Sequence, residues 1–207
     1  MKRPPGAART GTWIAGVACF LALVYIALNT LGTDAPGSKG LQKGEDMPPF
    51  AVPIATAPGP QNTDANVATK PGQGNAHHRA CDVRGPGVLN SCELTERGPV
   101  VLAFFATGDR RCVREVDVLD RLAPRFPGVS FAAVAIKAKR AQTADVVRRQ
   151  GWRMPVGFDH DAAVTNLYAV AICPLVTFAR AGGVVSETAL GFQDEAAVAR
   201  RVQALER

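Results

Sequence analysis

Two patterns of apolar residues alternate along the chain from about residue 100 to its end. Residues 100–106 form a short, wholly apolar run, which is typical of a strand buried on both faces of a sheet. Apolar residues then recur at helical spacing from Cys112 to Ala123, which predicts an amphipathic helix. The alternation continues and predicts strands at 129–136, 156–158, 175–179 and 184–190 and helices at 144–150, 161–168 and 193–205.

Residues that cap helices and form turns separate these predicted elements. We expect Thr143 to cap the start of the helix at 144–150 and Gly151 to end it. The pair Gly182-Gly183 predicts the tight turn of a hairpin. The resulting order, β-α-β-α-β-α-β-β-α, predicts an α/β fold with a mixed central sheet flanked by helices.

An uncharged apolar segment extends from Trp13 to Leu31 near the start of the chain. As a helix, these 19 residues would span about 28 Å, which is close to the apolar thickness of a bilayer. Lys2, Arg3 and Arg9 precede the segment without any acidic residue. This arrangement favours a cytoplasmic N-terminus followed by a membrane-spanning helix.

The apolar segment therefore predicts a single-pass protein of the cell membrane. Residues 1–11 would lie in the cytoplasm, residues 12–31 would form the transmembrane anchor, and the C-terminal part would lie outside the cytoplasm. The alternative is a cleaved signal peptide, whose apolar run is usually shorter and is followed by a clear cleavage site. The residues after Leu31 offer only a weak site, and both alternatives export the C-terminal part.

Three further segments follow the predicted anchor. Residues 32–43 contain glycine, proline and lysine without any period, which predicts a flexible linker. Residues 44–207 form the predicted folded domain, and they begin with a short edge strand because prolines cannot pair in a central one. Within this domain, residues 56–98 are predicted to be a loop insertion, since much of the segment is rich in proline, glycine and asparagine.

The charge composition argues against a nucleic-acid partner. Half of the formal net charge of +6 comes from the three cations before the apolar segment, and the other arginines are scattered. His77, His78 and Cys81 lie close together in the sequence but lack a clear fourth ligand. We therefore expect neither a metal nor another cofactor.

Cys81 and Cys92 flank a Gly-Pro-Gly turn. In an exported domain this spacing predicts a structural disulfide. A disulfide that closes a loop of this size would stabilise the fold by about 3 kcal/mol. The alternative is an auxiliary redox couple that exchanges with Cys112.

Five short motifs follow one another in the predicted domain: GEDMPPF at 44–50, FFATGDRRCVRE at 104–115, PVGFD at 155–159, YAVAICP at 168–174 and a strand–Gly-Gly–strand hairpin at 178–185. Their order and spacing resemble the thioredoxin superfamily, and most closely its membrane-anchored TlpA-like disulfide reductases and the related redoxins. The resemblance extends from about residue 44 to the end of the chain, although residues 56–98 match poorly. It implies a thioredoxin-like fold and thiol–disulfide chemistry.

The chain departs from this family at the pair of active-site cysteines. The first cysteine of the pair falls on Asp109, and only the second, Cys112, remains. Asp109 would cap the helix that carries Cys112, but it cannot act as a nucleophile. Its charge would oppose ionisation of Cys112, whereas Arg110 and Arg111 would favour it.

The resemblance also places Pro174 at the family's cis-proline, opposite the start of that helix. Cys173 would then face Cys112, and the two could form a redox pair if their Cα atoms lie about 5.5 Å apart. The alternative is two buried thiols without a role. The predicted catalytic set is therefore Asp109, Cys112, Cys173 and Pro174.

The predicted function is a membrane-anchored, extracytoplasmic thiol–disulfide oxidoreductase with a degenerate active site. Its partners would be protein or small-molecule thiols and disulfides. One alternative is a non-catalytic thioredoxin-fold module for binding or assembly, which the loss of a cysteine at Asp109 favours. A second alternative is a peroxidase-like redoxin with a single reactive cysteine, although Asp109 then replaces the expected threonine.

Overall fold

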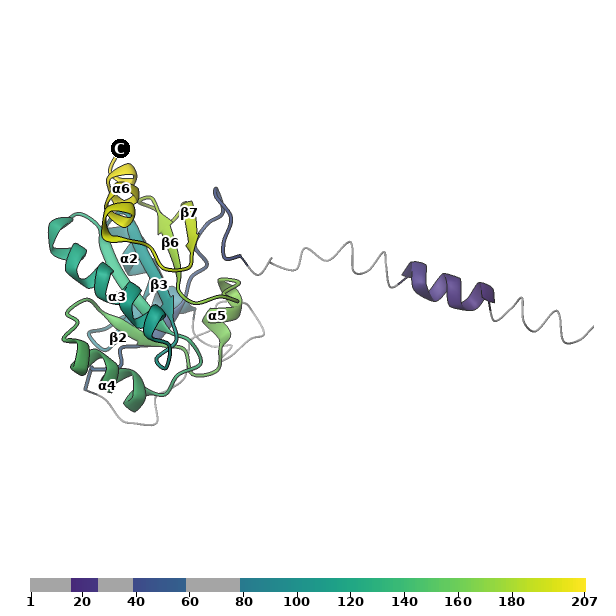
Figure 1. Cartoon of the computed structure of the whole chain (residues 1–207), viewed down its shortest axis with the longest axis horizontal. Coiled ribbons are helices and arrows are strands. Elements are labelled where there is room, and N and C mark those ends of the chain that lie inside the picture. Colours follow the sequence, from purple (N-terminus) through teal and green to yellow (C-terminus); the bar gives the residue numbers. More distant parts are fainter. Residues whose placement is uncertain (1–15, 26–38, 59–78) are drawn as a thin grey trace, which may run out of the picture. The chain divides into compact units, whose positions relative to one another are not determined.

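The computed structural model describes residues 16–25, 39–58 and 79–207 (Figure 1). The chain divides into two compact units, Met1–Gly37 and Ser38–Arg207. In the first unit, residues 16–25 form a helix, and the remainder of the predicted anchor at 12–31 lies outside the described residues. Within the described ranges, every helix is too short or too polar to span a bilayer.

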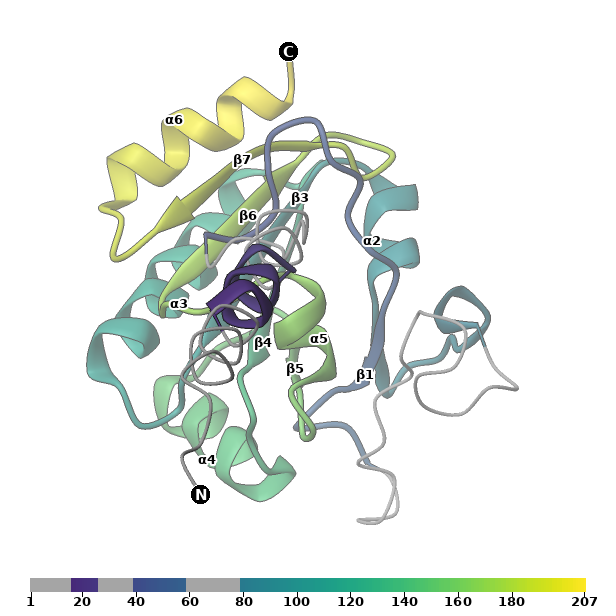
Figure 2. The ribbon, with the colours of Figure 1, turned by 90° about the vertical axis from the view of Figure 1, so that its right-hand side faces the viewer.

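A five-stranded mixed sheet lies at the centre of the second unit (Figure 2). Its strands are β3 (Val100–Phe105), β4 (Ser130–Ala135), β5 (Val156–Phe158), β6 (Leu175–Ala179) and β7 (Val185–Leu190). They lie in the order β5-β4-β3-β6-β7, in which β4 is parallel to β3 and β5 while β6 is antiparallel to β3 and β7. The α/β fold with a mixed central sheet, as predicted from the order of elements, is confirmed.

Helices cover both faces of this sheet (Figure 1, Figure 2). On one face lie α3 (Arg110–Leu122), α4 (Arg140–Gln150) and α6 (Glu195–Leu205), and on the other lie α2 (Ser91–Arg97) and α5 (Ala163–Leu167). Successive side chains of a strand point to opposite faces, so Val101 and Phe105 of β3 pack in the first core and Leu102 and Phe104 in the second. Because both faces are covered, the strand is apolar throughout.

The second half of the predicted loop insertion contains regular elements instead. β1 (Ala51–Pro53) pairs with β2 (Val88–Asn90) in a small antiparallel sheet, and α2 follows β2 directly. A short 3-10 helix at Ala80–Asp82 lies between β1 and β2 in the chain. With three residues in β2 and seven in α2, neither element is long enough to show a period in the sequence. Residues 59–78 lie outside the described part of the chain.

The predicted start of α4 was wrong. The helix begins at Arg140 rather than at residue 144, and no side chain caps it. Thr143 is buried within its first turns, where its hydroxyl donates a hydrogen bond to the carbonyl oxygen of Lys139 at 3.0 Å. The first turn is polar and carries no capping signal, which explains the error. Gly151 ends the helix in the left-handed region, as predicted.

The folded unit also begins before residue 44, where the predicted linker was expected to end. Leu41 is buried, and its carbonyl oxygen accepts a hydrogen bond from the hydroxyl of Thr188 at 2.7 Å. A Cβ atom at Gly40 would lie 2.5 Å from Cγ2 of Thr188, so only glycine allows this close approach. Gly40 and Leu41 therefore pack within the second unit.

Candidate active site

The first turn of α3 holds Cys112. Asp109 precedes the helix, and its Oδ1 atom accepts hydrogen bonds from the backbone N–H of Arg111 at 2.7 Å and of Cys112 at 3.4 Å. These donors belong to the first turn and have no partner within the helix itself. Asp109 is thus the N-cap that the sequence predicts, and Cys112 is the third residue of α3.

Cys173 and Pro174 lie immediately before β6, and the peptide bond between them is cis. In the antiparallel pair of β3 and β6, Phe104 lies opposite Leu175. The start of β6 therefore meets the end of β3, next to the start of α3. The Cα atoms of Cys112 and Cys173 are 5.7 Å apart and their sulfurs form a disulfide. This edge of the sheet brings together the four residues predicted for the site.

The two sulfurs of this disulfide have different surroundings. Cys112 has no exposed surface, whereas Cys173 is only partly buried. The backbone N–H of Ala106, in the turn after β3, donates a hydrogen bond to Sγ of Cys173 at 3.0 Å. Ala171 and Ile172, which precede Cys173, are exposed. Cys173 therefore lies at the mouth of the site and Cys112 behind it.

We expect the replacement Asp109→Ala to destabilise the protein by about 1 kcal/mol, because the N–H groups of Arg111 and Cys112 lose their acceptor. Urea denaturation monitored by circular dichroism measures this change. Asp109→Asn, which keeps the accepting oxygen, serves as the control and should lose much less. An equal loss in both variants would show that the charge, rather than the cap, carries the effect.

Glu115 lies one turn further along α3 and was not singled out from the sequence as a site residue. It is completely buried, and its Oε2 atom accepts a hydrogen bond from the backbone N–H of Gln193 at 2.7 Å. Its Oε1 atom has no hydrogen-bond partner within the described residues. Burial raises the pKa of Glu115 from 4.5 to about 7. The sequence feature that could have pointed to Glu115 is its position on the apolar face of the predicted helix, beside Val116.

A groove of about 440 Å³ opens beside the start of α3. It begins at Thr107 and Gly108, in the turn that follows Ala106, and extends to the end of α4. Three cations, Arg110, Arg114 and Arg149, line it together with one acidic residue, Asp117. A chain bound at the disulfide would therefore lie close to a positively charged surface.

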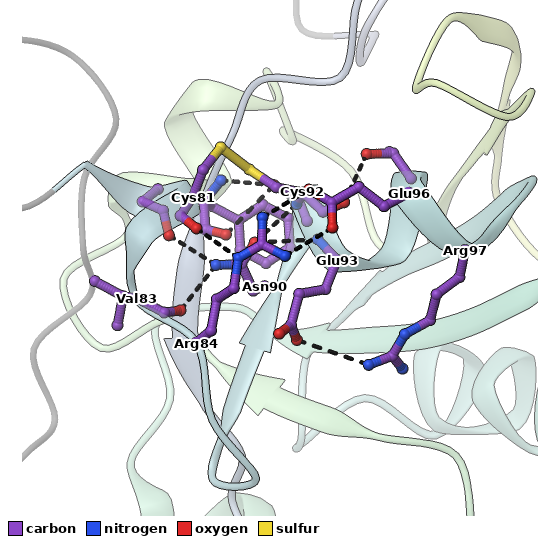
Figure 3. Close-up of polar contacts among 12 residues, drawn as sticks. Cys81, Val83, Arg84, Asn90, Cys92, Glu93, Glu96 and Arg97 are labelled. Carbon is purple, nitrogen blue, oxygen red and sulfur yellow. Dashed lines mark hydrogen bonds and ion pairs between the residues drawn. A yellow bond between two sulfur atoms is a disulfide. The ribbon is translucent and has the colours of Figure 1, made fainter.

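A second disulfide joins Cys81 to Cys92, with Cα atoms 5.5 Å apart (Figure 3). Asn90 lies beneath it and is buried. Its side-chain oxygen accepts hydrogen bonds from the N–H groups of Cys92 and Glu93, which caps α2, and its amide nitrogen donates to the carbonyl oxygens of Ala80 and Val83. The disulfide and the side chain of Asn90 therefore both hold the segment from Ala80 to Val83 against the start of α2.

No group of three or more potential metal ligands occurs among the described residues. Cys81, which the sequence places near two histidines, is bonded to Cys92. His77 and His78 themselves lie outside the described residues. That no metal is bound stays a prediction.

No protein-family model matches this sequence, and no curated protein matches it either. Solved structures do match. A protein from Chlorobium tepidum, named as a thiol:disulfide interchange protein DsbE, is 20% identical with a TM-score of 0.61, and the match covers 80% of this chain and 98% of that one. A secreted Mycobacterium tuberculosis disulfide oxidoreductase homologous to E. coli DsbE is 23% identical with a TM-score of 0.53, over 57% of this chain and 90% of that one.

The MTB protein dsbF, in its mixed oxidized and reduced forms, is 25% identical with a TM-score of 0.53, over 57% of this chain and 87% of that one. These likenesses concern the arrangement of the backbone. The chain therefore has a thioredoxin-like fold, with thiol:disulfide interchange proteins among its structural neighbours at low sequence identity.

Proposed function

We propose that this protein is a thiol–disulfide oxidoreductase whose redox pair is Cys112 and Cys173. The observation that carries the proposal is their disulfide, which joins the first turn of α3 to the cis-proline loop across a sequence separation of 61 residues. It supplies two sulfurs at the place where the superfamily resemblance implies a vicinal pair. Asp109 then acts as the cap of α3 and takes no part in sulfur chemistry.

The proposed reaction is thiol–disulfide exchange with protein or small-molecule thiols. A thiolate attacks one sulfur of a disulfide, a mixed disulfide forms, and the second cysteine of the pair resolves it. The groove lined by Arg110, Arg114 and Arg149 would attract thiolates and acidic chain segments to the site. Pro174, which adjoins Cys173 through a cis peptide bond, shapes the loop that presents it.

We place this chemistry outside the cytoplasm, at the membrane surface. The support is the second disulfide, Cys81–Cys92, since such bonds persist in oxidising compartments. The uncharged segment from Trp13 to Leu31 would serve as the anchor. Membrane fractionation of cells that express the full chain, followed by protease treatment of intact cells, tests the location.

The proposal predicts that the purified full-length chain catalyses reduction of insulin disulfides by dithiothreitol. Cys112→Ser and Cys173→Ser should each lower the rate close to that of the uncatalysed reaction, because the mixed disulfide must then wait for dithiothreitol instead of the second cysteine of the pair. Cys19→Ser is the matched control, since Cys19 is a free, exposed cysteine of the other unit. Its rate should equal that of the unchanged protein.

Peptide mapping of the oxidised protein without reductant gives the second measurement. We expect one peptide pair joined through Cys112 and Cys173, reducible in a graded series of thiol buffers. Free thiols at both positions after oxidation, or an insulin reduction rate that both serine variants retain, would overturn the proposal.

The second candidate function is a non-catalytic binding or assembly module. The specific observation that favours it is Asp109, which replaces the cysteine that attacks first in the family. Asp109→Cys distinguishes the two functions. This variant restores the family's vicinal dithiol with Cys112. If the unchanged protein is inactive but its scaffold is otherwise competent, the variant should raise the rate of insulin reduction above that of the uncatalysed reaction.

A peroxidase-like redoxin with a single reactive cysteine is the third candidate. It would consume hydrogen peroxide in a manner that depends on Cys112 and not on Cys173. The complete burial of Cys112 and its bond to Cys173 make it the weakest of the three.

A further inference from the structure

The two cysteines of the proposed redox pair differ in their access to a partner. Cys112 is completely buried in the core between α3 and the sheet, together with Val116 and Leu119. Cys173 is partly exposed, and its neighbour Ile172 is 49% exposed. The position where the superfamily resemblance implies the outer cysteine is occupied by Asp109.

From this asymmetry we infer that Cys173, in the cis-proline loop, is the sulfur that forms the mixed disulfide with the substrate. Cys112 is then the internal cysteine that resolves it. The inference rests on the proposed oxidoreductase function and specifies which cysteine of the pair reacts with the substrate. The resemblance implies that the sulfur linked to the substrate lies at the start of the helix. Our assignment places it in the loop before β6 instead.

The hydrogen bonds at the site favour the same assignment. The N–H of Ala106 donates directly to Sγ of Cys173, so a thiolate at Cys173 keeps a donor when the disulfide opens. At the start of α3, the carboxylate of Asp109 accepts the hydrogen bonds of the N–H groups of Arg111 and Cys112. That negative charge opposes a second one on the sulfur of Cys112, whereas Arg110 and Arg111, the latter 3.9 Å from Asp109, favour it. The assignment therefore rests on the donor to Cys173 and on the greater exposure of that residue.

Reduction of a substrate disulfide then proceeds in two steps. The thiolate of Cys173 attacks one substrate sulfur, the substrate S–S bond breaks, and the departing substrate thiolate takes up a proton. Cys112 loses its proton and attacks Sγ of Cys173, which forms the Cys112–Cys173 bond and releases the second substrate thiolate. Two electrons pass from the protein dithiol to the substrate, and a small or protein dithiol restores the reduced pair by the reverse steps.

Timed alkylation of the unchanged protein tests this order without any substitution. The full-length chain is reduced, freed of reductant, exposed to iodoacetamide for increasing times, quenched with acid and mapped by mass spectrometry. We expect the peptide with Cys173 to be labelled about tenfold faster than the peptide with Cys112, because thiolate character and exposure set the rate. Faster labelling of Cys112 would overturn the inference.

Trapping with oxidised glutathione provides a second, independent measurement. Cys112→Ser should accumulate a stable adduct of one glutathione at Cys173, while Cys173→Ser should form its adduct at Cys112 about tenfold more slowly. Thermal melts of both variants verify that they are folded, and Cys112→Ala replaces the serine variant if it melts early. Equal or reversed rates in folded variants would contradict the inference.

Insulin reduction by the unchanged protein separates this inference from the proposed function. If the protein catalyses that reduction and Cys112 is alkylated or trapped first, the function stands and the assignment of Cys173 fails. If there is no catalysis and the Cys112–Cys173 bond never forms, the proposed function fails, whichever thiol reacts first.

Discussion

The double replacement of Cys81 and Cys92 by serine is expected to lower the free energy of unfolding by about 3 kcal/mol. Their disulfide closes a loop with a sequence separation of 11 residues. Without it, the unfolded chain gains the conformational freedom of that loop, and the folded state must order the segment unaided. In urea, a loss of this size moves the midpoint by about 1 to 2 M.

The folded protein should nevertheless keep its shape in this variant. Asn90 still caps α2 and donates to the carbonyl oxygens of Ala80 and Val83, so the segment that the disulfide fastens keeps its polar partners (Figure 3). Far-ultraviolet circular dichroism should therefore remain unchanged at low denaturant. The Cys112–Cys173 bond is untouched, which allows the insulin assay to show whether the two disulfides act independently.

Arg84→Gln is the matched control for this prediction. Arg84 forms two hydrogen bonds with Glu96 beside the disulfide, at 2.7 and 2.6 Å, and its Nε donates to the carbonyl oxygen of Cys81 at 2.8 Å, but the side chains of Arg84 and Glu96 are well exposed. Exposed ion pairs contribute little because water and salt screen them. We expect this variant to change the unfolding free energy far less than the double serine variant. Equal losses in the two would show that the ion pair, not the covalent link, holds the segment.

The regular half of the chain could be predicted from the sequence because its elements are long or buried on both faces. β3 is a wholly apolar run between two cores, and α3 shows an apolar stripe that includes Val116 and Leu119. β2 and α2 could not be found, since β2 ends in the polar Asn90 and only Ser91 and Leu94 of the seven residues of α2 are buried, whereas the equally short β5 is apolar and buried throughout. Local pattern says little about such short elements, whose stability comes from tertiary contacts.

Part of the candidate site could also be predicted from the sequence, but for a different reason. Asp109 was expected as a cap because its residue type and position suffice for that inference. The approach of Cys173 to Cys112 came from the superfamily resemblance, because nothing local relates two residues 61 positions apart. The difference in their burial, and the donor that Ala106 supplies to Cys173, depend on how β3, β6 and α3 meet. Only the folded structure contains that information.

Glu115→Gln is expected to abolish a component of the pH dependence of stability worth about 2.5 kcal/mol between pH 5 and pH 8. Burial raises the pKa of Glu115 to about 7 in the folded protein, whereas the ordinary value is 4.5. Between these two values the folded state holds a proton that the unfolded state has released, so the free energy of unfolding falls as the pH rises. The fall in the free energy of unfolding approaches about 1.4 kcal/mol per pH unit between the two pKa values, and it vanishes above pH 7.

The direction follows from the environment of the carboxylate. Its Oε2 atom has one donor, the N–H of Gln193 at 2.7 Å, and its Oε1 atom has none within the described residues. One hydrogen bond does not compensate a buried charge for the loss of water. Glutamine keeps an oxygen that accepts the hydrogen bond from Gln193, and it stays neutral. The stability of the variant relative to the unchanged protein should therefore be greater at pH 8 than at pH 5.

Urea denaturation of both proteins across this pH range measures the effect, and the difference between the two profiles cancels the contribution of every other titrating group. Any packing defect that glutamine introduces shifts the variant's profile by a constant and leaves its shape unchanged. Glu206→Gln, which removes an exposed carboxylate after α6, is the control and should reproduce the profile of the unchanged protein. Parallel profiles for the unchanged protein and Glu115→Gln would mean that Glu115 is already charged at pH 5, and that water reaches this carboxylate in the core beneath Cys112.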